Sequence, residues 1–201
     1  MTHLRRADAP AAAELLAVAF ADDPYMTWIC PGGVDHIHAF MDLAVGFAID
    51  HGHAYVVRDA DDGAPAAAAL WAGPDSRQLP DERREYRQLF IEQRGDIDVL
   101  MDAFRIVAAA HPKEPHFYLN ILGSRPELRG QGLGATLIDH VVAECERQGV
   151  PAFLESSNPR NMTLYRRHGF VEGERVYVPD ESGVFITPMW REPGSGSVPT
   201  E

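Results

Sequence analysis

The sequence predicts an α/β fold in which helices flank a central sheet, and two observations support it. Residues 117–190 alternate between strand-like and helix-like patterns in the order strand, helix, strand, helix, strand. Upstream, the apolar runs HAYVVRD and AAAALWA are separated by turn residues at positions 61–63. The chain has 201 residues and 45% apolar content, which is enough for a single core. We therefore expect one domain over residues 1–192.

Helices are predicted before and between these strands. Residues 11–20 have a helical composition that ends at the polar stretch ADDP, and PGG makes a second break. From residue 34 onward, apolar side chains recur at helical spacing: Ile37, Phe40, Met41, Val45 and Ile49. Residues 80–110 predict two helices that meet near Gly95. The stretch HPKEP then breaks the chain before the strand FYLNILG.

The second half begins with a glycine cluster and an amphipathic helix. Residues 133–148 place their apolar side chains on one helical face. Gly149 stands where a helix-ending glycine belongs, and Pro151 follows just beyond it. The next apolar run, AFLES, is predicted to be a short strand.

The remaining elements complete the sheet. Asn158 is predicted to cap a helix that has Pro159 at its first position and ends before Gly169. Two last strands, FVEGERVYVP and GVFITPMW, follow it. Residues 193–201 contain no core-forming side chain, so we expect a flexible C-terminal tail.

Composition excludes several classes of function. The formal charge is −12 and no long basic tract is present, so binding to nucleic acid or to an anionic membrane is not expected. No apolar run is long enough to span a membrane, and MTHLRRADAP lacks the apolar core of a secretory signal. Cys30 and Cys145 cannot build a disulfide framework. We expect a cytoplasmic protein whose acidic surface suits an amine-bearing partner.

The glycine-rich stretch RGQGLGA, residues 129–135, admits three interpretations. A P-loop requires Lys after its last glycine, but Ala135 follows Gly134. A dinucleotide fingerprint is matched by the glycine spacing, with Glu155 as the acidic residue further on. However, SRPELR separates the glycines from the preceding strand, and too little chain follows Glu155 to complete a doubly wound sheet.

The third interpretation is an anion cradle at the start of a helix. Arg129, Gly132 and Gly134 form the pattern R-x-x-G-x-G directly before the amphipathic helix. Backbone amides in such a loop point into one concavity, and the helix start adds about half a positive charge. The absence of side chains lets phosphate groups approach. This arrangement predicts a site for a pyrophosphate.

Two longer stretches resemble the GNAT superfamily of acetyl-CoA-dependent N-acetyltransferases. LNILGSRPELRGQGLGATLI resembles the coenzyme A motif of that family, and NPRNMTLYRRHGF resembles the motif that follows it. HPKEP, PAFLES and AFADDP add a narrower resemblance to puromycin N-acetyltransferase-like members. Asn161 departs from the small residue that most of the superfamily carries there, which leaves the amine substrate open.

The resemblance implies a fold and an activity. The fold is a mixed, mostly antiparallel sheet of about six to seven strands, flanked by helices and splayed at the acyl-CoA site. The activity is transfer of an acetyl group from acetyl-CoA to a primary amine of a small molecule, an antibiotic-like one among the candidates, by direct attack on the thioester. The alternative is a non-catalytic acyl-CoA sensor or interaction module. A homodimer is a further expectation from the family.

The resemblance also implies which residues hold the donor. The backbone of residues 122–124 would pair with the pantetheine arm, and the amides of residues 129–135 would bind the pyrophosphate. Asn158, Asn161 and Tyr165 would complete the site. The donor-binding residues are then Leu122, Gly123, Ser124, Arg129, Gly130, Gln131, Gly132, Leu133, Gly134, Ala135, Asn158, Asn161 and Tyr165.

Tyr165 is the first candidate catalytic residue, because the leaving thiolate needs a hydrogen-bond donor. A thiol titrates near 8.5 and a tyrosine near 10, so full proton transfer from an unperturbed tyrosine is uphill by roughly 2 kcal/mol. A hydrogen bond to the developing thiolate is therefore the minimum role. The competing interpretation is that Leu164 and Tyr165 simply pack the helix onto the sheet.

A base is needed because an aliphatic amine is protonated at neutral pH. Glu155 is the first candidate, since it lies near the C-terminal end of its strand. Its competing interpretation is a structural carboxylate. His116 is the second candidate, and it shares one strand face with Tyr118 and Asn120. We expect all three of these side chains near the acceptor.

The acceptor pocket is expected along the first helices, where carboxylates and aromatic rings suit a cationic amine. The candidates there are Asp23, Tyr25 and Trp28, with Asp22 and Asp42 nearby. Asp23 is equally compatible with an ordinary helix-ending turn, and Trp28 with the core. The histidine pairs HIH and HGH are not expected to bind a metal, because side chains two residues apart on a helix point to different sides.

Overall fold

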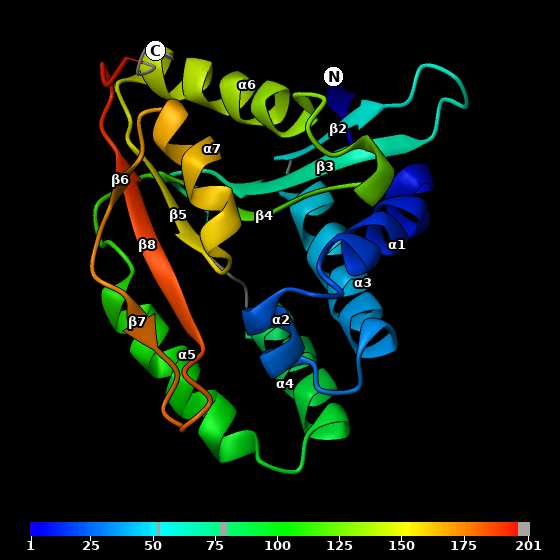
Figure 1. The fold of residues 1–201 in the computed structure, drawn as a ribbon, viewed down its shortest axis with the longest axis vertical. Helices are drawn as coiled ribbons and strands as arrows, with labels where there is room; N and C mark the ends of the chain where they lie inside the picture. The colour runs from blue at the N-terminus through cyan, green and yellow to red at the C-terminus, as the bar shows by residue number, and fades with distance from the viewer. Residues whose placement is uncertain (52, 77–79, 197–201) are drawn as a thin grey trace.

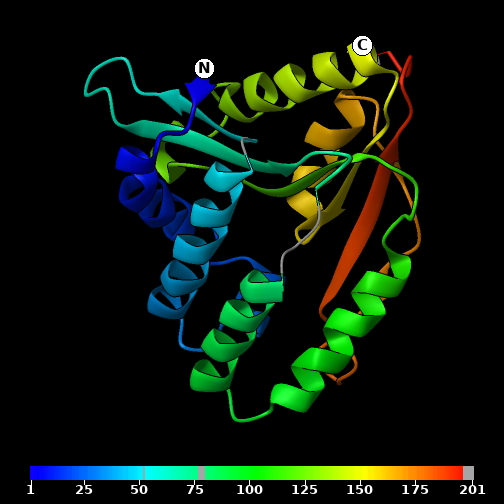
Figure 2. The same cartoon turned by 180° about the vertical axis from the view of Figure 1, so that it is seen from behind.

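The computed structural model describes residues 1–51, 53–76 and 80–196, and of residues 80 and 81 only the backbone. A curved sheet runs through the molecule, with helices on both faces (Figures 1 and 2). The strands are β1 (Thr2–His3), β2 (Ala54–Arg58), β3 (Pro65–Ala72), β4 (Phe117–Ser124), β5 (Ala152–Ser156), β6 (Val171–Glu172), β7 (Val176–Tyr177) and β8 (Phe185–Arg191). The helices are α1 (Ala9–Ala19), α2 (Pro24–Ile29), α3 (Val34–Asp50), α4 (Pro80–Gln93), α5 (Ile97–Ala110), α6 (Leu133–Gln148) and α7 (Met162–Arg167).

The sheet is mixed and mostly antiparallel, as the family resemblance implies. Its strand order is β1-β2-β3-β4-β5-β8-β6, and β7 pairs separately with β8. The β4–β5 pair is parallel, since α6 provides the crossover that such a pair requires. The described part contains eight strands, more than the six or seven expected. The two-residue strand β1 was not predicted, and the run 170–179 divides into β6 and β7.

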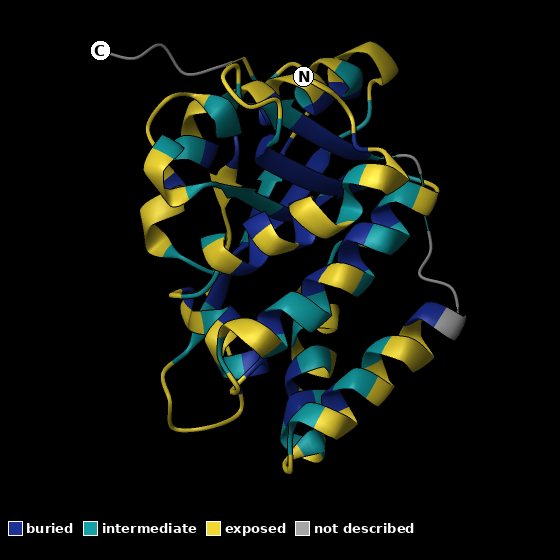
Figure 3. Cartoon of the chain, turned by 90° about the vertical axis from the view of Figure 1, so that its right-hand side faces the viewer, coloured by how far each residue is buried: buried dark blue, intermediate teal, exposed yellow. Residues whose placement is uncertain are grey.

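Two clusters of buried side chains lie on opposite faces of the sheet. Along β3, Ala68 and Leu70 face the cluster with α1 and α3, whereas Ala67, Ala69 and Trp71 face the cluster with α6 and α7. This alternation follows from the two-residue period of a strand. Figure 3 shows the central strands buried beneath helices whose outer sides are exposed. The small alanines let helices approach closely from both sides.

The helix α2 differs from the prediction, which placed only a break here. Asp23 lies before it in an extended conformation, and its Oδ1 accepts hydrogen bonds from the amides of Tyr25 (3.1 Å) and Met26 (2.9 Å). Pro24 takes the first helical position, where its missing amide costs nothing. The residues that suggested a turn are therefore the cap of a short helix.

The predicted helix signals in the C-terminal half are confirmed. Gly149 ends α6 in the left-handed conformation, with φ of 65°. The Asn158 side chain accepts from the amide of Arg160 at 3.1 Å and caps a short 3-10 turn, 159–161, which leads into α7. That helix ends before Gly169, as expected.

The predicted flexible tail falls partly outside the described residues. Its described part is held by hydrogen bonds, since the Gly194 amide donates to Glu146 Oε2 at 2.7 Å and Arg191 Nη2 donates to the Ser195 carbonyl at 3.0 Å. Residues 197–201 lie outside the described part, so their flexibility stays a prediction. No helix among the described residues is long and apolar enough to cross a membrane.

Candidate active site

The parallel strands β4 and β5 separate after only three paired residues. Phe117 to Leu119 pair with Ala152 to Leu154, and no further pairing joins the two strands in the described part of the chain. A bulge in β4 coincides with the separation, because Trp71 pairs with Leu119 and Leu70 pairs with Ile121, which leaves Asn120 unpaired and exposed. The sheet is therefore splayed at this point.

The far half of β4 keeps one free edge at this opening. Leu122, Gly123 and Ser124 pair with β3 on one side, while the side toward β5 has no strand partner among the described residues. Such an edge can accept hydrogen bonds from an extended ligand. Gly123 lies beneath the end of α1, since a Cβ there would meet Leu16 at 2.9 Å. This residue needs to be glycine so that α1 can approach.

The start of α6 faces the same opening. Gly130 and Gly132 have φ of 81° and 80°, and a Cβ on either would meet no atom within 4 Å. The first helical hydrogen bond runs from the Thr136 amide to the Gly132 carbonyl, so the amides of residues 133–135 precede the helical ladder. Amides that precede the first helical hydrogen bond, next to two glycines without close neighbours at their Cβ positions, match the chemistry of an anion cradle.

The Arg129 side chain does not extend toward this cradle but binds the end of α1. Its Nη2 donates to the Ala19 carbonyl at 3.0 Å. A Cβ on Gly134 would meet the Leu164 side chain of α7 at 3.4 Å. The loop therefore hydrogen-bonds to the end of α1 and packs close to α7, and both neighbours pre-organise its backbone.

Tyr165 lies on α7, on the sheet face covered by α6 and α7. It is only 7% exposed and packs edge-on against Phe170. Burial, and next to it the negative charge of Asp23, raise the pKa of Tyr165 well above its ordinary value. Within the described residues no hydrogen bond engages its hydroxyl, so this group is free to donate to a ligand.

Glu155 lies on β5 on the opposite face, and its two carboxylate oxygens have different surroundings. Oε2 accepts a hydrogen bond from the Tyr118 hydroxyl at 2.7 Å. Oε1 is buried and has no hydrogen-bond partner in the described part of the molecule. His111 Nδ1 lies 3.5 Å from Oε1. One oxygen is therefore anchored and the other is left unsatisfied, which is costly unless a ligand or proton engages it.

Two tyrosines surround this carboxylate. Burial, and then the charge of Glu155, raise the pKa of Tyr118 far above its ordinary value and also raise the pKa of Tyr25. Both hydroxyls therefore keep their protons at neutral pH. The Phe153 ring of β5 stacks against the Tyr118 ring, with 5.9 Å between centroids.

His116 uses both ring nitrogens inside the protein. Nδ1 lies 2.6 Å from the Glu114 carbonyl oxygen, and Nε2 lies 3.1 Å from Nε2 of His111. The ring is buried against Phe153 and Trp190. Burial lowers the pKa of His116, so the imidazole is neutral at neutral pH. It has no nitrogen left for an acceptor amine.

The other residues predicted for the acceptor pocket are engaged within the protein to different degrees. Asp23 caps α2, and its Oδ2 accepts from Ser157 at 2.7 Å. The Trp28 indole donates to Asp180 Oδ2 at 2.6 Å, and the Arg94 guanidinium lies over its ring. Tyr25 packs against Trp28. These contacts hold α2 in place beside the splayed strands. Asn120 and Asn161, in contrast, are exposed.

The structure adds residues that the sequence did not indicate. His111, Ser157, Asp180 and Arg94 contact the predicted residues from distant parts of the chain. Only His111 carried a local signal, as a histidine at the start of the HPKEP break.

The histidines of the HIH and HGH pairs, considered for metal binding, contact different partners. His38 pairs with Glu14 and Asp42, and His51 pairs with Glu82.

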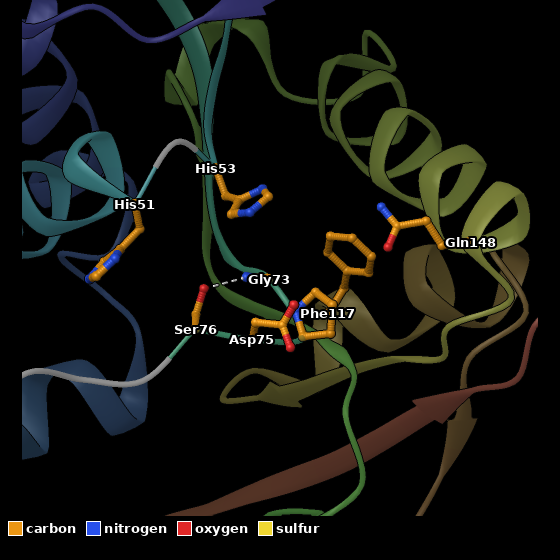
Figure 4. A pocket seen from close by; sticks show the side chains of 8 residues that line it. His51, His53, Gly73, Asp75, Ser76, Phe117 and Gln148 are labelled. Atoms are coloured by element: carbon orange, nitrogen blue, oxygen red, sulfur yellow. Dashed lines mark hydrogen bonds between the residues drawn. The ribbon is translucent and has the colours of Figure 1, made fainter.

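Metal ligation has no candidate here: the described residues contain no group of three or more His, Cys, Asp or Glu side chains arranged to hold an ion. A pocket of about 520 Å³, shown in Figure 4, lies at the other end of β4. Its lining includes Phe117 at the start of β4 and Gln148 at the end of α6. Because neither Glu155 nor Tyr165 lines it, the splayed end of the sheet remains the candidate active site.

Comparison with known proteins agrees with this geometry. The chain is 26% identical over 210 residues to an uncharacterised N-acetyltransferase of Schizosaccharomyces pombe, a match covering 92% of this chain and 80% of that protein. A solved histone acetyltransferase HPA2 and related acetyltransferase from Corynebacterium glutamicum superposes with a TM-score of 0.72 at 26% identity, covering 100% and 97% of the two chains.

A third comparison shows the same fold at lower identity. A polyamine N-acetyltransferase of Drosophila melanogaster, which forms N-acetylagmatine, has a TM-score of 0.60 at 17% identity and covers 91% and 96% of the chains. The sequence profile of the Acetyltransferase (GNAT) family matches residues 22–170, which include both the cradle and the splay. The chain belongs to the Acetyltransferase (GNAT) family and is an acetyl-transfer enzyme.

Proposed function

We propose that this enzyme transfers an acetyl group from acetyl-CoA to a primary amine of a small molecule, by direct attack of the amine on the thioester. The observation that carries the proposal is the unsatisfied Oε1 of Glu155, buried beside the splayed strands. A protonated amine supplies the hydrogen that this oxygen lacks. The Drosophila relative acts on an amine of this kind, which supports the same substrate class here.

The residues present fit the donor. The amides of residues 129–135 would hold the pyrophosphate, since those of residues 133–135 precede the helical ladder and no atom lies within 4 Å of a Cβ placed on Gly130 or Gly132. The free edge of residues 122–124 would hold the pantetheine arm as an added strand. Asn158 supports this site indirectly by starting the turn into α7. When bound, acetyl-CoA supplies the activated acetyl group.

Glu155 is the proposed general base. Its Oε2 is fixed by Tyr118, which directs Oε1 to take the proton from the ammonium group. Tyr118 and Tyr25 keep their protons, so neither competes with Glu155 for that role. His116 then serves as a positioning residue and not as the general base, for which it was the second candidate.

Tyr165 is the proposed donor to the departing sulfur. Its raised pKa makes full proton transfer costlier than for an ordinary tyrosine, so its role is a hydrogen bond that strengthens as charge develops on sulfur. The negative charge of Asp23 raises the pKa of Tyr165 further, because it opposes loss of the tyrosine proton. The hydroxyl is available because the protein does not use it elsewhere in the described structure.

The acceptor proposed is a cationic amine with a small apolar part. Tyr25 and Trp28 form a stacked aromatic pair on α2, and Asn120 is exposed in the bulge. The formal charge of −12 favours approach of a cation. An antibiotic-like acceptor, the puromycin-like subgroup, a homodimer and a cytoplasmic location stay proposals at this level.

The test is a screen of primary amines with acetyl-CoA, read as free thiol released. We expect release with phenethylamine or agmatine above the rate without amine. Calorimetry on the pure protein measures acetyl-CoA binding separately. Absence of acetyl-CoA binding would refute the proposal, and binding without thiol release across the screen would favour a sensor that uses the same cradle.

A further inference from the structure

The contacts around Glu155 form a chain whose hydrogen positions are fixed from one end. The chain runs from the Glu114 carbonyl oxygen through His116 and His111 to Glu155. A carbonyl oxygen can only accept, so His116 Nδ1, 2.6 Å away, carries a hydrogen and donates it. Because burial keeps the His116 ring neutral, its Nε2 is left as an acceptor.

The tautomer of the second histidine follows. The two Nε2 atoms lie 3.1 Å apart, and that of His116 has no hydrogen, so His111 Nε2 donates. In neutral His111 the Nδ1 atom then presents a lone pair to Glu155 Oε1. Oε1 and Nδ1 are then two acceptors that face each other without a hydrogen between them. This explains why they lie 3.5 Å apart, beyond a normal hydrogen bond, and why Oε1 has no hydrogen-bond partner among the described residues.

We propose that His111 relays to solvent the proton that Glu155 takes from the acceptor amine, and that His116 positions His111 by fixing its tautomer. The relay rests on the proposed function. One proton fits between Glu155 Oε1 and His111 Nδ1, and the ammonium group of the acceptor loses one proton before it attacks. His111 and His116 act through Glu155, so both are positioning residues in this scheme.

The proton can be followed through each step. The ammonium N–H bond breaks and an O–H bond forms at Oε1, which leaves a neutral amine to attack. The proton then passes from Oε1 to the lone pair of Nδ1, restoring the carboxylate and making His111 an imidazolium. The His111 side chain is 32% exposed whereas that of Glu155 is 10% exposed, so Nδ1 releases the proton to water.

The other ionisable groups around this chain do not replace the pair. Tyr118 on β4, Tyr25 on α2 and Tyr86 on α4 all have raised pKa values because they are buried, so they stay neutral. The Glu114 side chain, in the turn before β4, acts on His116 by its charge. In the proposed relay the proton passes between Glu155 and His111, so the experiments below compare variants of both residues.

The first experiment reads the tautomers directly. Long-range ¹H–¹⁵N correlation spectra of the ligand-free, full-length protein at pH 8 are expected to show the hydrogen on Nδ1 of His116 and on Nε2 of His111. Replacement Glu155→Gln is expected to alter the His111 titration. A hydrogen on Nδ1 of His111 at pH 8, or a titration unaffected by Glu155→Gln, overturns the relay.

The second experiment measures turnover with acetyl-CoA and phenethylamine. His111→Gln is expected to lower kcat about 10- to 100-fold and to flatten its rise with pH, with unchanged affinity for acetyl-CoA. Imidazole added to His111→Ala is expected to restore turnover. A reaction with imidazole but without phenethylamine gives the background rate to be subtracted. His38→Gln is the matched control, since His38 is 35% exposed and lies on α3, and is expected to behave as wild type.

The outcomes separate the relay from the proposed function. Wild-type turnover and pH profile in His111→Gln overturn the relay while leaving the transferase intact. Failure of the wild-type protein to bind acetyl-CoA overturns the transferase. If phenethylamine is not acetylated, the spectra of the wild type and of Glu155→Gln still decide the relay, because they require no acceptor.

Discussion

Replacement Tyr165→Phe tests the role of the tyrosine hydroxyl. A hydrogen bond to a charged group contributes about 1.5–3 kcal/mol, and this bond would exist only as sulfur becomes negative. Its loss is therefore expected to lower kcat about 10- to 150-fold. The hydroxyl has no hydrogen bond in the described structure, so we expect the free energy of unfolding to change by less than about 1 kcal/mol.

The assay compares thiol release with phenethylamine, acetyl-CoA binding by calorimetry, and unfolding in urea. Acetyl-CoA affinity is expected to stay within about twofold, since the hydrogen bond belongs to the transition state. The control is Tyr177→Phe, which removes the same atom from a tyrosine that is 53% exposed on β7. Turnover of Tyr165→Phe equal to that of wild type would show that Tyr165 is a core residue and would refute the reasoning.

Three further predictions use the termini of α6 and two carboxylates. Gly132→Ala and Gly149→Ala both force alanine into left-handed backbone and should each destabilise the fold by about 1–2 kcal/mol. Only Gly132→Ala should weaken acetyl-CoA binding in calorimetry, and equal affinities would contradict the cradle. The Arg58 and Arg5 guanidiniums lower the pKa of Asp8 to about 2. The Asp8 carboxylate therefore stabilises the folded protein above about pH 4, and this contribution is lost as the pH falls toward 2. Asp8→Asn should accordingly lower the urea midpoint at pH 6 but not at pH 2. Asp23→Ala should cost about 1 kcal/mol of unfolding free energy through loss of the α2 cap, whereas Asp23→Asn, which keeps the accepting oxygen, should cost less.

The sequence predicted the local structure where its signals are local. Gly149 and Asn158 act on residues within one turn of themselves, so a short pattern determines their geometry. The glycines of the cradle are a partial case. Gly130 and Gly132 are favoured by their positive φ, so the number of glycines alone does not demonstrate an anion site.

Contacts across the fold could not be predicted in this way. Trp28 and Asp180 are 152 positions apart in the chain and meet only because the turn between β7 and β8 reaches α2. Glu155 and His111 meet because β5 pairs with β4, and His111 begins the segment that leads from α5 into β4. Periodicity assigns a strand face to a residue but does not identify its neighbour from another element.

The opening of the active site follows from how the sheet is assembled. The strand β4 pairs with β3 from Tyr118, opposite Ala72, to Ser124, opposite Ala67, and only the bulged Asn120 interrupts this pairing. The strand β5 is likewise paired along its whole length with β8. Each strand follows its own antiparallel partner, and only three residues of each are shared between them. The gap that follows lies between two strands that are each held by a partner on the far side, so it can admit an extended ligand without unfolding either strand. Glu155 lies one residue beyond the last shared pair, which places its free oxygen at the point where the strands part.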